Sequence, residues 1–221
     1  DAVLHFAALK AAGESMIQPE EYATINITGT INILNHIIES EVKNIVFSSS
    51  AAVYGMPEYL PIDEKHPINP INFYGYSKLA IENLLHWFSN LKGVRFGALR
   101  YFNAAGADPD MEIGENHIPE THLIPSVLDV ALGRSDCINI FGNDYPTDDG
   151  TCVRDYIHVT DLADAHFRAL RYLENSGVSK AFNLGTEVGV SVQSVIDSVR
   201  RITCLLYTSD AADEGLGVDL G

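Results

Sequence analysis

Short apolar stretches alternate with amphipathic stretches along the first half of the chain. The apolar segments 1–8 (DAVLHFAA), 43–50 (KNIVFSSS) and 94–102 (VRFGALRYF) are separated by helix-like segments at 19–40 and 74–90. Such a β-α-β-α-β order needs crossover connections, which produce a mostly parallel sheet with helices on both faces. The alternation therefore predicts the α/β class and a doubly wound parallel sheet.

The two helix-like segments differ in what marks them. In 19–40, Ile25, Ile33, Leu34, Ile37 and Ile38 recur at helical spacing behind an acidic first turn, which predicts one crossover helix. Segment 74–90 follows a loop rich in proline and asparagine and predicts a second helix.

The chain becomes irregular after residue 103. Loops surround a short helical stretch at 123–133, and a further helix, ending at Gly177, precedes the strand-like AFNLG at 181–185. Long ordered loops often carry binding residues. We predict a sheet domain at 1–103 and a smaller binding portion at 104–203, interleaved with the core. Residues 204–221 are acidic and aperiodic, and we interpret them as a non-native or disordered tail.

The formal net charge of −16 excludes several classes of partner. An acidic chain repels a phosphate backbone, so nucleic acid is not expected as a partner. No apolar run reaches the roughly 20 residues of a membrane helix, and three cysteines without C-x-x-C spacing favour a reducing compartment. We therefore expect a soluble, cytoplasmic protein. Because the chain starts without methionine inside an apolar run, we also expect it to be part of a longer protein.

Three chemically active side chains are expected at one edge of the sheet. Ser50 ends the second apolar segment, Tyr74 starts the next helix, and Lys78 follows one turn later. A tyrosine that acts as a base near neutral pH needs its pKa lowered by about 3, or roughly 4 kcal/mol, and a nearby ammonium favours that change. The alternative is a helix-start aromatic, a solvated lysine and a polar turn, and spacing alone does not decide between them.

Metal binding is not expected. The eight histidines show no H-E-x-x-H or other paired-ligand spacing, so we interpret His5 and His158 as structural and the rest as surface residues. The acidic residues from Asp108 to Glu115 favour a solvated loop over a metal cage.

Several motifs, in this order, resemble those of the UDP-glucose 4-epimerases in the extended short-chain dehydrogenase/reductase superfamily. The stretches are HFAALKAAGES, NITGT, FSSSAAVYG, YGYSK, RYFNAAGA, IFGNDYPTDDGTCVRDYIHVTDLADAH and AFNLG, and the resemblance extends over about 1–201. It implies a Rossmann-like fold, bound NAD, a UDP-hexose substrate and a role in galactose metabolism. The reaction would interconvert UDP-galactose and UDP-glucose through a transient 4-keto sugar.

The resemblance also implies roles for individual residues. Tyr74 would be the catalytic base, Lys78 would lower its pKa and hold the nicotinamide ribose, and Ser50 would bond the 4-hydroxyl of the sugar. The cofactor cleft would also include Phe6, Ala7, Ala8, Leu9, Lys10, Asn26 and Phe102. The substrate site would also include Asn103, Leu123, Asn139, Ile140, Phe141 and Arg154. For Arg154, the alternative is a structural pair with Asp155.

Other functions remain possible at this point. A nucleotide-sugar 4,6-dehydratase is disfavoured because it needs an acid-base pair where this chain has Ala51 and Ala52. A UDP-glucuronate or UDP-N-acetylhexosamine 4-epimerase, or a non-catalytic scaffold of the same fold, is not excluded. The glycine-rich phosphate loop of the family is absent from these residues, so we expect the chain alone to hold NAD poorly and to be inactive. We expect a homodimer for the full-length protein.

Overall fold

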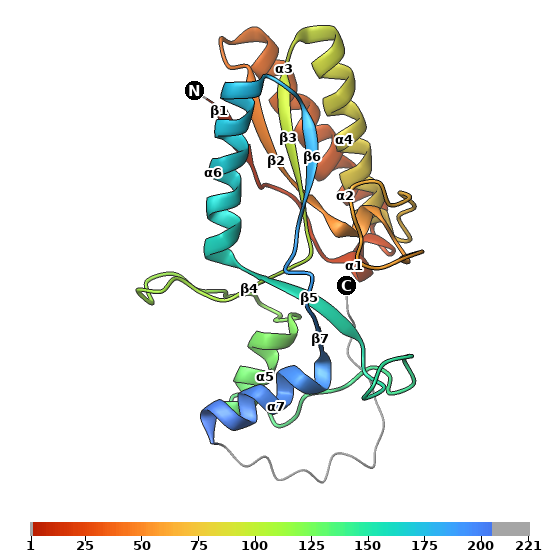
Figure 1. Ribbon diagram of the computed structural model, residues 1–221, viewed down its shortest axis with the longest axis vertical. Coiled ribbons are helices and arrows are strands. Elements are labelled where there is room, and N and C mark those ends of the chain that lie inside the picture. Colours follow the sequence, from red (N-terminus) through yellow and green to blue (C-terminus); the bar gives the residue numbers. More distant parts are fainter. Residues whose placement is uncertain (1, 205–221) are drawn as a thin grey trace. The chain divides into compact units, whose positions relative to one another are not determined.

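The computed structural model describes residues 2–204, which form two compact units. The first unit comprises residues 2–104 and Thr160–Gly185, and the second comprises 105–159 and 186–204. Each unit has its own sheet and its own hydrophobic core. Figure 1 labels the helices and strands.

The first unit is built on a four-stranded sheet with the order β1-β2-β3-β6. Its strands are β1 (Ala2–His5), β2 (Asn44–Ser50), β3 (Arg95–Tyr101) and β6 (Lys180–Leu184). Every neighbouring pair is parallel, and Ser50 lies opposite Tyr101 at the carboxyl end. This confirms the predicted α/β class, because the carboxyl ends of parallel strands share one edge of the sheet.

Helices cover both faces of this sheet, as Figure 1 shows. On one face, α3 (Gly29–Glu39) and α4 (Phe73–Lys92) pack against Ile45 and Phe47. On the other face, α6 (Val159–Ser176) packs against Val46. Successive β2 side chains therefore point to opposite cores, as strand geometry requires. Fully burying one such side chain contributes about 1.5–3 kcal/mol, so β2 is anchored from both sides.

The predicted crossover helix at 19–40 is interrupted in the structure. It consists of α2 (Pro19–Tyr22), the π-helical segment η1 (Ala23–Thr28) and α3, preceded by the short α1 (Ala12–Ser15). A wider π turn shifts the side chains that follow it around the helix axis, and such turns are frequent at functional sites. Leu34 and Ile37 are buried as predicted, but Ile25 is exposed, so the single apolar face was wrong at its first residue.

The helix that carries Tyr74 and Lys78 is close to its predicted bounds. The Asn72 side chain caps α4 by accepting a hydrogen bond from the Gly75 amide at 2.8 Å. At the other end, Gly93 has a φ of 71°, a left-handed cap that glycine adopts without steric cost.

A second sheet has three strands in the order β4-β5-β7, and β5 and β7 belong to the second unit. Its strands are β4 (Asn103–Ala105), β5 (Val153–His158) and β7 (Gly189–Ser191), and the helices of the second unit are α5 (Leu123–Ala131) and α7 (Val192–Thr203). The helices share a core with Cys152. We did not predict α7 from the sequence, although its buried residues Val192, Val195, Ile196 and Val199 have helical spacing.

The division into two units agrees with the predicted boundary near residue 103, but a later segment returns to the first unit. Thr160–Gly185 belongs to the first unit because β6 pairs with β3 and α6 covers that sheet. The short 3-10 turn η2 (Ala51–Val53) completes the list of elements. Apart from Cys204, the predicted tail lies outside the described residues.

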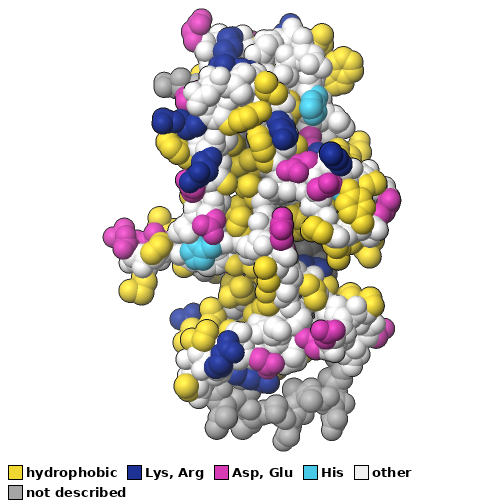
Figure 2. Space-filling model, in the orientation of Figure 1, with side chains coloured by type: hydrophobic (Ala, Val, Ile, Leu, Met, Phe, Trp, Pro, Cys, Tyr) yellow, Lys and Arg dark blue, Asp and Glu magenta, His cyan; other side chains and the backbone are white. Residues whose placement is uncertain are grey.

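Two further observations concern the surface. Among residues 2–204, no helix is both long enough and apolar enough to cross a membrane. On the face drawn in Figure 2, lysine and arginine are interspersed with acidic side chains and form no single basic patch. That face therefore lacks the clustered positive charge typical of nucleic-acid binding.

Candidate active site

The carboxyl end of β2 presents a serine to the start of α4. Ser50 is the last residue of β2, and its hydroxyl accepts a hydrogen bond from the Ala52 amide at 3.1 Å. The Ser50 side chain is also near enough to the phenol of Tyr74 to lower its pKa by hydrogen bonding. The structure thus brings together two of the residues that the sequence predicted to meet.

Several contacts fix the first turn of α4. The Tyr74 amide donates a hydrogen bond to the Ser15 hydroxyl at 3.0 Å. Gly75 lies so close to η2 that a Cβ atom there would be 2.5 Å from the Ala52 carbonyl oxygen. The helix can therefore reach the end of β2 only because residue 75 has no side chain. This close approach places Tyr74 next to Ser50.

Lys78 is buried one turn after Tyr74, with only 4% of its surface exposed. Its Nζ donates a hydrogen bond to the Ser48 carbonyl at 2.7 Å and lies 5.6 Å from the centre of the Tyr74 ring. Burial lowers the pKa of Lys78 to about 8, so most of the side chain stays protonated at neutral pH.

The pKa of Tyr74 lies above that of a free tyrosine. Burial raises it to about 12, and hydrogen bonding by Ser50 offsets only part of that change. The lowering of this pKa by Lys78 stays a prediction for the complete protein with its cofactor. The Lys78 ammonium donates its hydrogen bond to the Ser48 carbonyl.

The loop after β1 contains the residues predicted for the cofactor cleft. Phe6, Ala7 and Lys10 are exposed, whereas Ala8 and Leu9 are partly buried. Asn26 in the π-helical segment is fully buried and holds this loop from both sides. Its Oδ1 accepts from the Leu9 amide at 2.8 Å, and its Nδ2 donates to the Leu9 carbonyl at 3.0 Å. Asn26 therefore positions the loop, and its amide is already engaged by protein.

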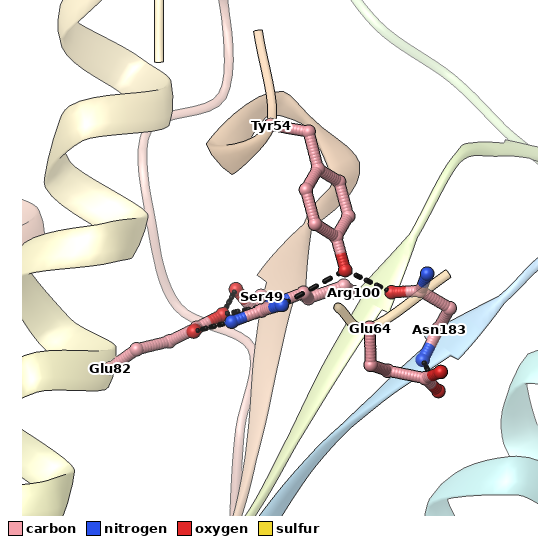
Figure 3. Close-up of polar contacts among 6 residues, drawn as sticks. All are labelled: Ser49, Tyr54, Glu64, Glu82, Arg100 and Asn183. Carbon is pink, nitrogen blue, oxygen red and sulfur yellow. Dashed lines mark hydrogen bonds and ion pairs between the residues drawn. The ribbon is translucent and has the colours of Figure 1, made fainter. Parts of the chain in front are cut away.

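A buried ion pair, not identified from the sequence, fixes the face of α4 that carries Tyr74 and Lys78 (Figure 3). Glu82, one turn after Lys78, accepts from Arg100 Nη2 at 2.6 Å and from Arg100 Nε at 3.0 Å. The Ser49 hydroxyl donates to Glu82 Oε1 at 2.5 Å. This joins α4 to β2, at the residue before Ser50, and to β3.

The network continues to the next strand. Arg100 Nη1 donates to the Tyr54 hydroxyl at 2.9 Å, and that hydroxyl donates to Asn183 Oδ1 of β6 at 2.6 Å. The Asn183 amide donates to Glu64 Oε1 at 2.9 Å. Arg100 and Glu82 side chains are only 6% and 3% exposed. The sequence signal was a charged residue inside the apolar segment 94–102, at position 100, together with Glu82 on the predicted helix.

The residues predicted for the substrate lie in both units. Asn103 lies two residues after β3. It follows Phe102, which was predicted for the cofactor cleft and whose amide donates to the Leu184 carbonyl at 3.4 Å. In the second unit, Leu123 is 4% exposed and its side chain belongs to the core. Asn139 and Phe141 line an open pocket of about 340 Å³, whereas Ile140 packs against the core.

Arg154 on β5 does not form the structural pair considered from the sequence. Asp155 instead accepts hydrogen bonds from the Thr186 and Glu187 amides. Arg154 Nη1 contacts the Cys152 sulfur and the Val153 carbonyl, and within residues 2–204 it takes part in no ion pair. An arginine without a carboxylate partner suits an anionic ligand.

A parallel sheet with serine, tyrosine and lysine gathered at its carboxyl edge is typical of nucleotide-binding enzymes with a Rossmann-type fold. The sequence profile of the NAD dependent epimerase/dehydratase family matches residues 1–185. The chain belongs to that family.

Individual relatives are similar over nearly the whole chain. The UDP-glucose 4-epimerase of Halalkalibacterium halodurans is 53% identical over 203 residues, which are 92% of this chain and 61% of the relative. The human UDP-glucose 4-epimerase is 48% identical over 204 residues, 90% of this chain and 58% of the relative. The chain thus spans about three fifths of the length of these relatives.

Solved structures are similar as well. The UDP-glucose 4-epimerase of Brucella ovis in complex with NAD is 49% identical with a TM-score of 0.89, over 90% of this chain and 62% of that one. The enzyme of Bifidobacterium longum in complex with NAD+ and UDP is 41% identical with a TM-score of 0.87, over 94% of this chain and 62% of that one.

Proposed function

We propose that the complete protein containing this chain is a UDP-glucose 4-epimerase that interconverts UDP-galactose and UDP-glucose with bound NAD. The observation that carries the proposal is the meeting of Ser50, Tyr74 and Lys78 at the carboxyl edge of a parallel sheet. The relatives at about half identity support it, because all those reported above are named for this activity.

The donors at this edge fit the nicotinamide half of NAD. An ammonium has three protons to donate, and Lys78 uses one of them for the Ser48 carbonyl. The remaining protons suit the hydroxyls of a ribose. The exposed Phe6 and Ala7 at the end of β1 offer an apolar surface to a planar ring. We propose Phe6–Lys10, Asn26 and Phe102 as the wall of this cleft, with Asn26 acting through the loop that it holds.

The chain's own residues would move the proton. Tyr74 takes the proton of the sugar 4-hydroxyl, which Ser50 orients. It returns the proton after the bound 4-keto sugar has rotated to present its other face. NAD supplies the acceptor and donor of the hydride. Because the protein alone raises the pKa of Tyr74 to about 12, positive charge from Lys78 and from the oxidised cofactor is needed to favour the phenolate. Base formation is thereby linked to the presence of the oxidised cofactor.

The UDP part of the substrate would be held by the second unit. We propose that Arg154 pairs with the diphosphate, and that Leu123, through its backbone, and Asn139–Phe141 line the nucleotide site, with Asn103 near the sugar. The exchange of UDP-hexoses would place the protein in galactose metabolism. A homodimer in the cytoplasm stays a prediction.

A second candidate is a 4-epimerase for N-acetylated sugars. A solved UDP-Glc/GlcNAc 4-epimerase of Campylobacter jejuni is 38% identical with a TM-score of 0.79. A UDP-uronate epimerase or a non-catalytic scaffold would share the sheet and differ in the assay below.

The test is conversion of UDP-galactose to UDP-glucose by the completed protein, with Tyr74→Phe and Tyr76→Phe as a matched pair. Tyr76 lies on the same helix and is exposed. Loss of the base is expected to lower kcat by about 10²–10⁴-fold, whereas Tyr76→Phe keeps most of the activity. Turnover only of N-acetylated or uronate substrates would change the assigned sugar. Absence of both turnover and NAD binding would favour the scaffold.

A further inference from the structure

A cluster of histidine and glutamate side chains lies in the segment that leads into α5. Its members are Glu115, His117, Glu120 and His122. Each offers one donor atom, and these atoms all lie within 4.8 Å of one another. Neither the histidine spacing nor the acidic run indicated this arrangement. His117 and His122 are partly exposed, which agrees with their interpretation as surface residues.

The distances between the candidate ligand atoms are close to those between the ligand atoms of a bound metal ion. His117 Nδ1 is 3.2 Å from Glu115 Oε1 and 3.5 Å from Glu120 Oε2. In a tetrahedral zinc site with bonds near 2.1 Å, donor atoms are about 3.4 Å apart. His122 Nδ1 also contacts Glu115 Oε1, and the two imidazole rings are 5.2 Å apart between centroids. Only small side-chain movements would enclose an ion.

Ordinary hydrogen bonds do not account for the whole cluster. His117 Nδ1 is shielded from solvent and makes no hydrogen bond, although two carboxylate oxygens lie near it. A polar atom buried in that way lowers stability. Coordination to a metal would satisfy it. This unsatisfied nitrogen therefore supports a metal site independently of the number of acidic residues nearby.

Glu120 is oriented for this role by the backbone. Its Oε1 accepts hydrogen bonds from the Thr121 and His122 amides, both at 2.8 Å, which leaves Oε2 facing His117. A carboxylate with one oxygen held by backbone hydrogen bonds and the other facing the ion is typical of metal sites.

We propose that Glu115, His117, Glu120 and His122 form a structural Zn²⁺ site. Two imidazoles and two carboxylates match the borderline preference of Zn²⁺, whereas Mg²⁺ favours oxygen ligands and water. All four ligands lie within residues 115–122, so the loop that the ion closes is short and its closure costs little entropy. His122 is also the residue before α5, and its carbonyl accepts from the Ser126 amide at 3.1 Å. The ion would therefore fix the loop to the start of that helix.

The test is calorimetric titration of Zn²⁺ into the EDTA-treated, dialysed 221-residue chain at neutral pH. We expect one ion per chain, and binding at least about tenfold weaker in His117→Gln and in Glu115→Gln, since even outer-shell partners contribute that much. Circular dichroism before titration checks that each variant is folded. We expect both variants to fold, because Glu115 is exposed and His117 is partly exposed.

A matched control separates a four-donor site from a single histidine–glutamate pair. His36 and Glu39 form such a pair at 3.8 Å on α3, so His36→Gln should leave the affinity for Zn²⁺ unchanged. Mg²⁺ should not compete. The proposal is overturned if no one-to-one Zn²⁺ binding occurs, if both site variants bind like the parent chain, or if Mg²⁺ binds equally well. None of these outcomes depends on the epimerase activity.

Discussion

Burying the Lys78 ammonium should cost stability at neutral pH, and this cost should disappear in alkali. The pKa of Lys78 falls from 10.5 to about 8 because the side chain is buried. That difference corresponds to about 3 kcal/mol against the folded, protonated state. Because the folded pKa lies below the unfolded one, the full cost is present below pH 8 and is lost as the pH rises through 10.5.

Lys78→Met removes the titrating group and keeps most of the side-chain volume. At neutral pH, the variant gains about 3 kcal/mol and loses about 1–3 kcal/mol, because the Ser48 carbonyl no longer receives its hydrogen bond at 2.7 Å. The net change there is small. The diagnostic quantity is the free energy of unfolding of the parent minus that of the variant, which should rise by about 2–3 kcal/mol between pH 7 and pH 10.

Urea unfolding of both proteins, followed by circular dichroism at several pH values, measures this difference. Lys92→Met, which removes an exposed ammonium at the far end of the same helix, corrects for the change in net charge. Parallel curves for the parent and Lys78→Met would refute the reasoning, because they would mean that Lys78 titrates alike in the folded and unfolded chain.

Two further predictions concern the supports of the site. Glu82→Gln leaves Arg100 buried without its carboxylate, so it should lower the free energy of unfolding by about 3–5 kcal/mol, measured by urea unfolding. The double change Glu82→Leu with Arg100→Met should recover much of that loss, and a double variant as unstable as the single one would contradict this account. Gly75→Ala should lower epimerase activity in the completed protein. The added Cβ would lie 2.5 Å from the Ala52 carbonyl oxygen and would force the start of α4, including Tyr74, away from η2. Unchanged kcat in Gly75→Ala would show that the close approach is not needed.

Local patterns were sufficient for the main features of the first unit. Alternating apolar and amphipathic segments predicted the parallel sheet, and Asn72 and Gly93 explain why α4 begins and ends near the predicted residues. The meeting of Ser50 and Tyr74 also followed from the sequence, since both lie next to the carboxyl edge of a strand.

Other features depend on contacts between residues far apart in the chain. Glu82 meets Arg100 only after α4 has packed on β3, and β6 joins the first sheet only through its register with β3. Helical spacing could not show the π turn at Asn26, because a buried amide that binds Leu9 from 17 residues away stabilises it.

The sequence by itself determined the class of fold and the family, and it predicted three residues for the chemistry, a role that stays a proposal. These rest on periodicity and on motifs of adjacent residues, which are local properties. Only the tertiary structure decided the protonation and the surroundings of those residues. Burial raises the pKa of Tyr74 and lowers that of Lys78, and burial is a sum over neighbours that the fold brings together from separate segments.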